Sequence, residues 1–213
     1  MKNKKIEMLV ESAIMIALAV ALDLVSAVLP FTQLPFGGKF TLCAMLPLVY
    51  VAVRYGLGTG LLSGFVYSLI QLAIGFAKHP SSLMLDKWYL TVLMLFIDYI
   101  LAYTALGLGS LGRGLKTPSG RFTLGAFLGT LFRYVCHIVS GAIFYGAWAT
   151  WFFEEGDLAG TAFAKFFLDN FSGTGMSIAY SAVYNGLYMI PEIIITTVVA
   201  FALSKIPVIA KRV

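Results

Sequence analysis

Six apolar segments follow one another along the chain, and they constrain the fold more than any other feature. The segments cover residues 8–29, 40–55, 57–77, 88–112, 122–149 and 177–204. Hydrophobic residues make up 60% of the 213 residues and charged residues only 12%, which is more apolar surface than the core of a water-soluble domain can bury. At about 20 residues per span, the sequence predicts an all-α integral membrane bundle of six transmembrane helices. It is expected to form a single domain over residues 1–213.

The second apolar segment, residues 40–55, is short for a membrane span and contains Pro47. Proline removes one hydrogen bond from a helix interior. We therefore expect this segment to be tilted, broken or partly re-entrant.

The basic residues indicate the orientation of the chain in the membrane. Six spans place both termini on one side, and assigning that side as cytoplasmic puts ten lysines and arginines inside against four outside. The inner ten are Lys2, Lys4, Lys5, Arg54, Arg113, Lys116, Arg121, Lys205, Lys211 and Arg212, and the outer four are Lys39, Lys78, Lys87 and Lys165. This excess agrees with the positive-inside rule, so both termini are expected to be cytoplasmic. The net charge of +5 then reflects membrane orientation and not nucleic-acid binding, and the first span is expected to be retained and not cleaved as a signal peptide.

Several activities lack the residues that they need. The chain contains no GxxxxGK[ST] phosphate-binding loop, so it is not expected to hydrolyse ATP. One histidine and scattered carboxylates within the spans do not form a metal-ligand set. Because the spans also show no nucleophile–base pair, the sequence predicts a protein that is not an enzyme and that needs no metal or cofactor.

Ionisable residues inside membrane spans are costly and mark functional positions. In the fourth segment, Tyr99 and Tyr103 share one helical face, Trp88 projects near them three turns earlier, and Asp98 lies beside that face. A lone carboxylate in lipid needs a cation, a proton or hydrogen-bond donors. Two interpretations of Asp98 remain open, a cationic ligand or an internal partner such as Arg133.

The fifth segment places Arg133 and His137 one turn apart on one face, with Tyr145 near the outer end. A lone histidine can be a hydrogen-bonded packing residue, but an arginine on the same face favours a functional role for His137. Both interpretations stay open.

The sixth segment carries a polar and aromatic stripe formed by Tyr184, Tyr188 and Glu192, with Asn185 beside it. Aromatic packing alone would also explain these rings. Aromatic faces bind cations, however, and a carboxylate pairs well with the donor edge of an amino-heterocycle. Together the fourth, fifth and sixth segments therefore predict a site for a flat, aromatic, cationic solute.

Two further features concern the surface. Ala13, Ala17 and Ala21 form a stripe of small residues in the first span, which permits either close packing inside the bundle or docking of another membrane subunit. The aromatic and acidic loop 150–176 is predicted to cover an outward-facing pocket or to lie at the membrane interface.

At these residues the chain resembles the thiamine-specific substrate-binding subunits, or S-components, of energy-coupling factor (ECF) transporters. The segments that carry the resemblance are Ala13/Ala17, Gly37–Leu42 before Met45–Pro47, Arg54–Leu57, His79–Pro80, Asp98–Ala102, Arg133–Tyr134 with His137, Ala179–Ser181, Tyr184–Gly186 and Pro191–Glu192. They span nearly the whole chain.

The resemblance implies a six-helix bundle that binds the vitamin near its outer face. The predicted substrate-binding residues, from the resemblance and the spacing together, are Trp88, Asp98, Tyr99, Arg133, His137, Tyr145, Tyr180, Tyr184, Asn185 and Glu192. Some members of the family also have a carboxylate in the second helix before its proline. This chain has Thr41-Leu42-Cys43 there, so that contact is either missing or supplied by Glu192.

The resemblance further implies high-affinity thiamine binding and uptake in the cell membrane of a bacterium. The stripe Ala13/Ala17/Ala21 would dock on a transmembrane coupling subunit that works with two ATPase subunits, and the lipid bilayer is the remaining partner. Two alternatives stay open. One is an S-component for another vitamin or a thiamine precursor, and the other is a stand-alone proton-coupled transporter of a cationic metabolite.

Overall fold

The structure is a computed structural model that describes residues 2–32, 40–78 and 83–213. Over these residues every regular element is a helix. Within this described part of the chain, five helices are long and apolar enough to cross a membrane, namely Asn3–Ala27, Leu57–Lys78, Trp88–Gly114, Pro118–Phe144 and Gly173–Leu203, and Leu46–Tyr55 is a shorter apolar helix. The predicted all-α membrane bundle is therefore confirmed. The sequence segments Gly37–Lys39 and His79–Pro80, which contributed to the family resemblance, lie outside the described residues.

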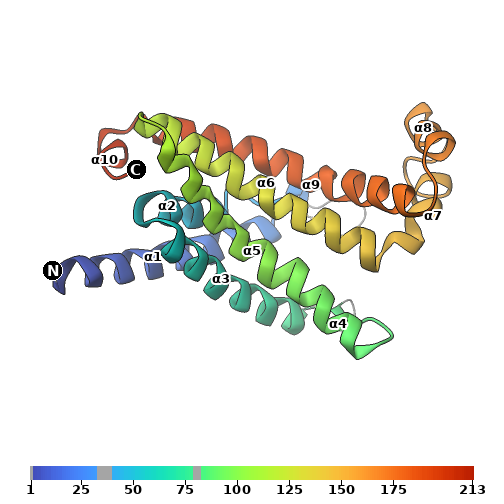
Figure 1. The fold of residues 1–213 in the computed structure, drawn as a ribbon, viewed down its shortest axis with the longest axis horizontal. Coiled ribbons are helices and arrows are strands. Elements are labelled where there is room, and N and C mark those ends of the chain that lie inside the picture. The colour runs from blue at the N-terminus through green and yellow to red at the C-terminus, as the bar shows by residue number, and fades with distance from the viewer. Residues whose placement is uncertain (1, 33–39, 79–82) are drawn as a thin grey trace.

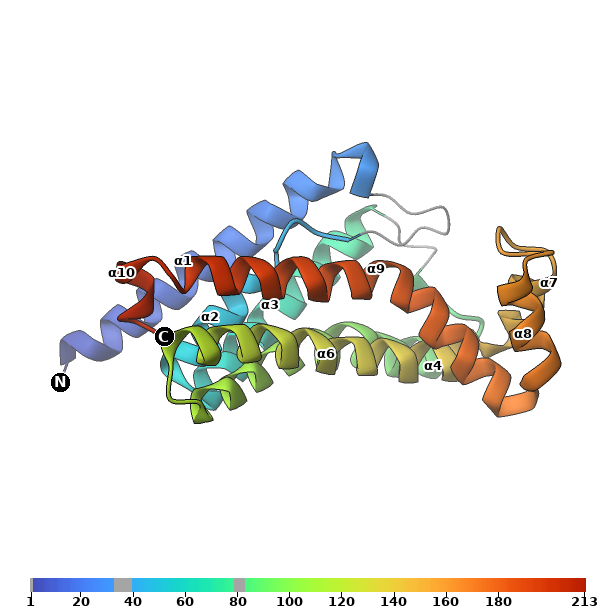
Figure 2. The same cartoon turned by 90° about the horizontal axis from the view of Figure 1, so that it is seen from above.

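The long helices run roughly along one axis of an elongated bundle (Figure 1). The elements are α1 (Lys2–Ala27), η1 (Pro30–Thr32), α2 (Leu46–Tyr55), α3 (Leu57–Lys78), α4 (Trp88–Leu95), η3 (Phe96–Leu101), α5 (Ala102–Thr104), η4 (Ala105–Gly114), α6 (Pro118–Phe144), η5 (Gly146–Trp148), α7 (Ala149–Glu154), α8 (Ala162–Asn170), α9 (Gly173–Leu203) and α10 (Pro207–Ala210). Both termini lie at one end of the bundle, and α7 and α8 lie at the other (Figures 1 and 2). The common end of the termini agrees with the predicted topology, while the side of the membrane on which they lie stays a prediction.

The second span differs from its prediction at its start. α2 begins at Leu46 and not at residue 40, so Pro47 stands in the first turn, where its missing N–H needs no helical partner. The proline therefore starts this helix instead of breaking it. Its ten residues extend only about 15 Å, and Leu46–Val53 are buried by the surrounding helices.

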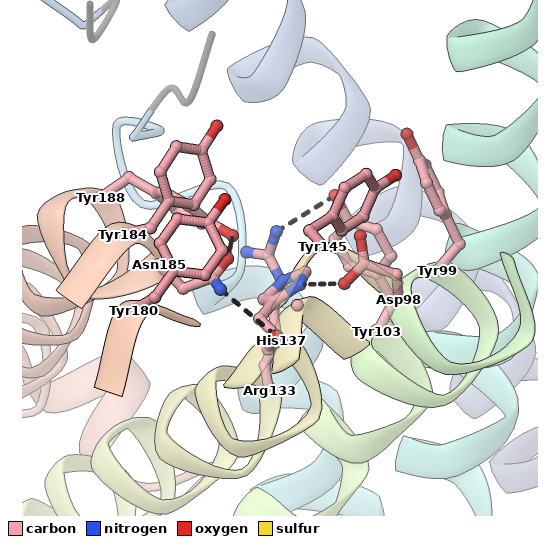
Figure 3. A pocket seen from close by; sticks show the side chains of 11 residues that line it. Asp98, Tyr99, Tyr103, Arg133, His137, Tyr145, Tyr180, Tyr184, Asn185 and Tyr188 are labelled. Atoms are coloured by element: carbon pink, nitrogen blue, oxygen red, sulfur yellow. Dashed lines mark hydrogen bonds and ion pairs between the residues drawn. The ribbon is translucent and has the colours of Figure 1, made fainter. Parts of the chain in front are cut away.

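The fourth span is one continuous helix with irregular turns. Residues Phe96–Leu101 form a π-helical turn, and Ala105–Gly114 continue as a 3₁₀ helix. Single π turns inside α-helices are frequent at functional sites, and this one contains Asp98 and Tyr99. The turn packs beside α6, and its Asp98 side chain faces His137 of that helix (Figure 3).

Glycine allows the fourth span to approach its neighbours closely. A Cβ atom on Gly107 would lie 2.4 Å from the backbone nitrogen of Leu61 in α3, and one on Gly109 would lie 2.7 Å from the carbonyl oxygen of Gly125 in α6. Small residues at such crossings let helices pack backbone to backbone in lipid. These contacts hold the fourth span between α3 and α6.

α6 and α9 form the long wall of the bundle and lie side by side over most of their length (Figures 1 and 2). α6 begins at Pro118 because the Thr117 side chain caps its first turn by accepting a hydrogen bond from the Gly120 N–H at 3.1 Å. Beyond α6, loop 150–176 is largely helical. Phe152 of α7 packs on Tyr180 of α9, with their ring centroids 5.2 Å apart. The loop thus covers one end of the α6–α9 pair.

Candidate functional site

A cavity of about 400 Å³ lies between α6, α9 and the π-helical turn of the fourth span (Figure 3). Its lining residues are Asp98, Tyr99, Tyr103, Arg133, His137, Gly141, Tyr145, Tyr180, Tyr184, Asn185 and Tyr188. Six of these residues are tyrosines, so aromatic rings make up most of the wall.

Asp98 and His137 form a hydrogen-bonded pair on this wall. The Asp98 Oδ1 atom lies 2.7 Å from the His137 Nδ1 atom, and their side chains are 29% and 7% exposed. A carboxylate on one ring nitrogen orients an imidazole and selects its tautomer. The internal partner of Asp98 is therefore His137 and not Arg133, and the pair forms part of the cavity surface.

Arg133 lies one turn inward from His137 on the same face of α6. Its guanidinium lies over the ring of Tyr103, 4.4 Å from the ring centroid. Its Nη2 donates to the Tyr103 hydroxyl at 3.3 Å, and its Nη1 donates to the Met45 sulfur at 2.9 Å. The sequence left the role of this arginine open, and the structure places it in the cavity wall.

Asn185 ties α9 to α6 at the cavity. Its Nδ2 donates to the His137 carbonyl oxygen at 3.2 Å and to the Ser181 carbonyl oxygen at 2.8 Å, and its Oδ1 accepts from the Tyr188 hydroxyl. A Cβ atom on Gly141 would lie 2.3 Å from the Ser181 hydroxyl, so glycine is what lets the two helices come this close. Asn185 therefore positions His137 and Tyr188 through hydrogen bonds.

The tyrosines form two groups that face each other across the cavity (Figure 3). Tyr180 and Tyr184 lie on the α9 side with ring centroids 5.9 Å apart, and Tyr99 and Tyr103 lie on the fourth span with centroids 6.4 Å apart. Burial and then the negative charge of Asp98 raise the pKa of the Tyr145 hydroxyl. That phenol therefore stays protonated at neutral pH and presents a hydrogen-bond donor.

Eight of the ten residues predicted from the sequence line this cavity. They are Asp98, Tyr99, Arg133, His137, Tyr145, Tyr180, Tyr184 and Asn185. Sequence reasoning did not select Tyr103, Gly141 and Tyr188 as binding residues, although each stands four residues after a selected one. Helical periodicity alone could have found them.

Trp88 does not reach the cavity. It lies at the start of α4, is 77% exposed, and packs its ring on Tyr89. The prediction assumed regular α-helical spacing over the three turns between Trp88 and Tyr99. The π turn from Phe96 to Leu101 adds about one residue to the helix, and this rotates the side chains before the turn by about 100° relative to those after it. The helical phase that would align Trp88 with Tyr99 is therefore lost.

Glu192 does not line the cavity either. Glu192 is only 2% exposed. Its carboxylate accepts hydrogen bonds from the Thr41 N–H and, at 2.6 Å, from the Thr41 hydroxyl. It therefore anchors the residues before α2 to α9. Among the lining residues that the structure describes, Asp98 is the one carboxylate.

Ala13, Ala17 and Ala21 are all exposed on α1. The interpretation of this stripe as packing inside the bundle is therefore wrong, and the stripe is available to lipid or to another protein.

Membrane-crossing helices around an aromatic cavity with one acid–imidazole pair define a multi-pass membrane protein that can enclose a small molecule. The family model described as "Thiamine transporter protein" matches residues 9–151. The thiamine transporter ThiT of Bacillus subtilis is 33% identical over 210 residues, which cover 93% of this chain and 90% of that protein. The thiamine transporter ThiT of Lacticaseibacillus paracasei is 26% identical over 160 residues, covering 70% and 73% of the two chains. The chain therefore belongs to the thiamine transporter protein family.

A solved structure of ThiT from Listeria monocytogenes has the same fold. It superposes with a TM-score of 0.61 at 21% sequence identity, and the match covers 97% of this chain and 98% of that one. Since the curated relatives are named as transporters, the protein is a transport protein and not an enzyme. It is a multi-pass protein of the bacterial cell membrane.

Proposed function

We propose that this chain binds thiamine with high affinity in the cavity and serves its uptake as the substrate-binding subunit of an ATP-driven ECF transporter. The observation that carries the proposal is the Asp98–His137 pair on a wall of six tyrosines, in a chain whose relatives are named thiamine transporters.

The cavity suits both rings of thiamine chemically. The thiazolium ring carries a positive charge, and the faces of Tyr180, Tyr184 and their neighbours attract a desolvated cation by about 2 kcal/mol per contact. The aminopyrimidine ring presents an amino group, which donates to the Asp98 carboxylate. We therefore place the pyrimidine edge on Asp98 and the thiazolium against the tyrosines.

The buried charges also favour a cation. Asp23, Glu192 and Arg133 are 3%, 2% and 9% exposed, and both Asp23 and Arg133 interact electrostatically with Glu192. With Asp98 added, carboxylates outnumber guanidinium groups around the cavity, so a cationic guest reduces the imbalance.

In the proposed transporter, ATP is hydrolysed by other subunits, because this sequence has no phosphate-binding loop for ATP. We place the contact with a transmembrane coupling subunit on the exposed stripe Ala13/Ala17/Ala21 of α1, where the absence of large side chains lets a partner helix approach closely. The two ATPase subunits would then act through that coupling subunit.

The test is calorimetric titration of the purified chain in detergent with thiamine, without ATP and without partners. We expect tight binding at one site per chain. A parallel thermal-shift panel with thiamine, a free aminopyrimidine precursor and riboflavin should show the largest stabilisation for thiamine, because a ligand at 1,000 times its Kd stabilises the fold by about 4 kcal/mol. A larger shift with another vitamin would assign a different substrate. Uptake by proteoliposomes that contain this chain alone, driven by a pH gradient, would show a stand-alone transporter instead.

A further inference from the structure

Arg133 is the most poorly paired charged group in the cavity wall. The residue is 9% exposed, and a guanidinium has five N–H donors that need acceptors. Among the described residues it donates to two acceptors. The Met45 thioether is a weak acceptor, and the hydrogen bond to the Tyr103 hydroxyl is long at 3.3 Å. Over residues 2–32, 40–78 and 83–213, its Nε has no hydrogen-bond partner.

No carboxylate compensates this charge directly within the described part of the chain, where Arg133 forms no salt bridge. Glu192 interacts with it electrostatically, but the Glu192 carboxylate already accepts two hydrogen bonds from Thr41. A buried donor without an acceptor is strongly unfavourable. Arg133 therefore has donor capacity that a ligand in the cavity can use.

A second nitrogen in the cavity wall, on His137, also lacks a hydrogen-bond partner among the described residues. This atom, Nε2, is buried one turn outward on the same face of α6. Figure 3 shows the Arg133 guanidinium between the two groups of tyrosines, facing the same space as the Asp98 carboxylate. The same cavity wall thus carries an acceptor on Asp98 and an unpaired donor on Arg133.

The carboxylates around Arg133 determine whether its ligand acceptor is charged or uncharged. Asp98, Asp23 and Glu192 all act electrostatically on Tyr103, the ring on which Arg133 lies. An oxyanion placed at Arg133 would be repelled by three carboxylates. An uncharged acceptor, such as an aromatic ring nitrogen, gains the hydrogen bond without that repulsion.

We propose that Arg133 determines ligand specificity by donating a hydrogen bond to an uncharged ring nitrogen, so that Asp98 and Arg133 together recognise the adjacent amino group and ring nitrogen of an aminopyrimidine. This inference rests on the proposed function. It assigns Arg133 to the pyrimidine ring of thiamine and not to the hydroxyethyl group or to a phosphate on it.

The test pairs side-chain changes with single-atom changes in the ligand. Calorimetry measures the Kd of the wild-type chain, Arg133→Met and Arg133→Lys for thiamine and for the analogue whose pyrimidine nitrogen next to the amino group is replaced by CH. In the wild type the analogue should bind about 10- to 100-fold more weakly, as expected for a lost charged hydrogen bond. Arg133→Met should lose a similar factor for thiamine and should show almost no further loss with the analogue. Arg133→Lys, which keeps the charge and replaces the planar guanidinium by an ammonium group with three N–H donors, should retain part of the discrimination.

The assignment would be wrong if Arg133→Met weakened the binding of thiamine and of the analogue by the same factor, because that is the effect of a purely structural arginine. Thiamine monophosphate is a third ligand in the series. If Arg133→Met weakened the phosphate ester much more than thiamine, the arginine would recognise an oxyanion and the inference would be wrong. If Arg133→Met does not fold, as judged by gel filtration, the Arg133→Lys comparison decides. Failure of the wild type to bind thiamine would refute the proposed function itself. Tight binding by the wild type, together with equal weakening of both ligands in Arg133→Met, would refute only the role of Arg133.

Discussion

The change Asp98→Asn tests the electrostatic basis of the cavity most directly. Asparagine has nearly the same shape as aspartate, and its carbonyl oxygen can still accept from His137 Nδ1, now 2.7 Å from Asp98 Oδ1. The change therefore removes the negative charge and leaves the geometry of the wall largely intact. A cationic ligand should lose affinity for that reason alone.

The magnitude follows from the exposure of the site. Because the Asp98 side chain is 29% exposed, an effective dielectric constant of about 20 is appropriate, and a unit charge about 5 Å away then interacts by about 3 kcal/mol. Since each 1.4 kcal/mol is about tenfold in Kd, Asp98→Asn should weaken thiamine binding by about 100-fold.

The assay is calorimetric titration with thiamine and with an analogue whose thiazolium is replaced by an uncharged aromatic ring. The charged ligand should lose most of its affinity and the neutral one much less. Asp86→Asn is the matched control, because Asp86 is exposed and lies outside the cavity, and it should change neither Kd. Equal losses for both ligands, or an unchanged Kd for thiamine in Asp98→Asn, would refute the reasoning.

Three further predictions concern residues away from the cavity. Ala17→Trp should abolish uptake in cells with a complete transporter while thiamine binding by the isolated chain stays unchanged, and Leu18→Trp on a neighbouring face of α1 is its control. Normal uptake by Ala17→Trp would show that the stripe does not serve docking. Trp88→Ala should leave the Kd for thiamine within about twofold, since the ring lies outside the cavity, and a tenfold loss would return Trp88 to the binding site. Glu192→Ala should lower the melting temperature, because it leaves the buried N–H and hydroxyl of Thr41 without their acceptor. Each unpaired group costs about 1–3 kcal/mol of stability, so an unchanged melting temperature would contradict the assigned role of Glu192.

Several features of this protein could be predicted from the sequence because they depend on local spacing or on composition. Long apolar segments specify membrane helices wherever they lie. An ionisable residue inside such a segment stands out because lipid penalises it, which is how Asp98 and His137 were selected. Residues four apart share a helical face, so the association of Tyr184 with its neighbours in the cavity also followed from local periodicity.

Where a helix begins depends on contacts that the sequence does not display. α2 starts at Leu46 because Thr41 is held by Glu192 of α9 and because Cys43 has a φ of 61°, which lies outside the right-handed helical region. The same contact removes Glu192 from the cavity. Both outcomes result from a pair 151 residues apart in the chain.

The pairing of charges was likewise decided by the tertiary structure. The sequence offered Arg133 as the internal partner of Asp98, but the π turn and the close approach at glycines such as Gly109 rotate the fourth span so that Asp98 meets His137. Spacing along one helix defines a face, because helical geometry is local. Which faces meet depends on helix rotation and close packing, because these are set by backbone contacts between segments far apart in the chain.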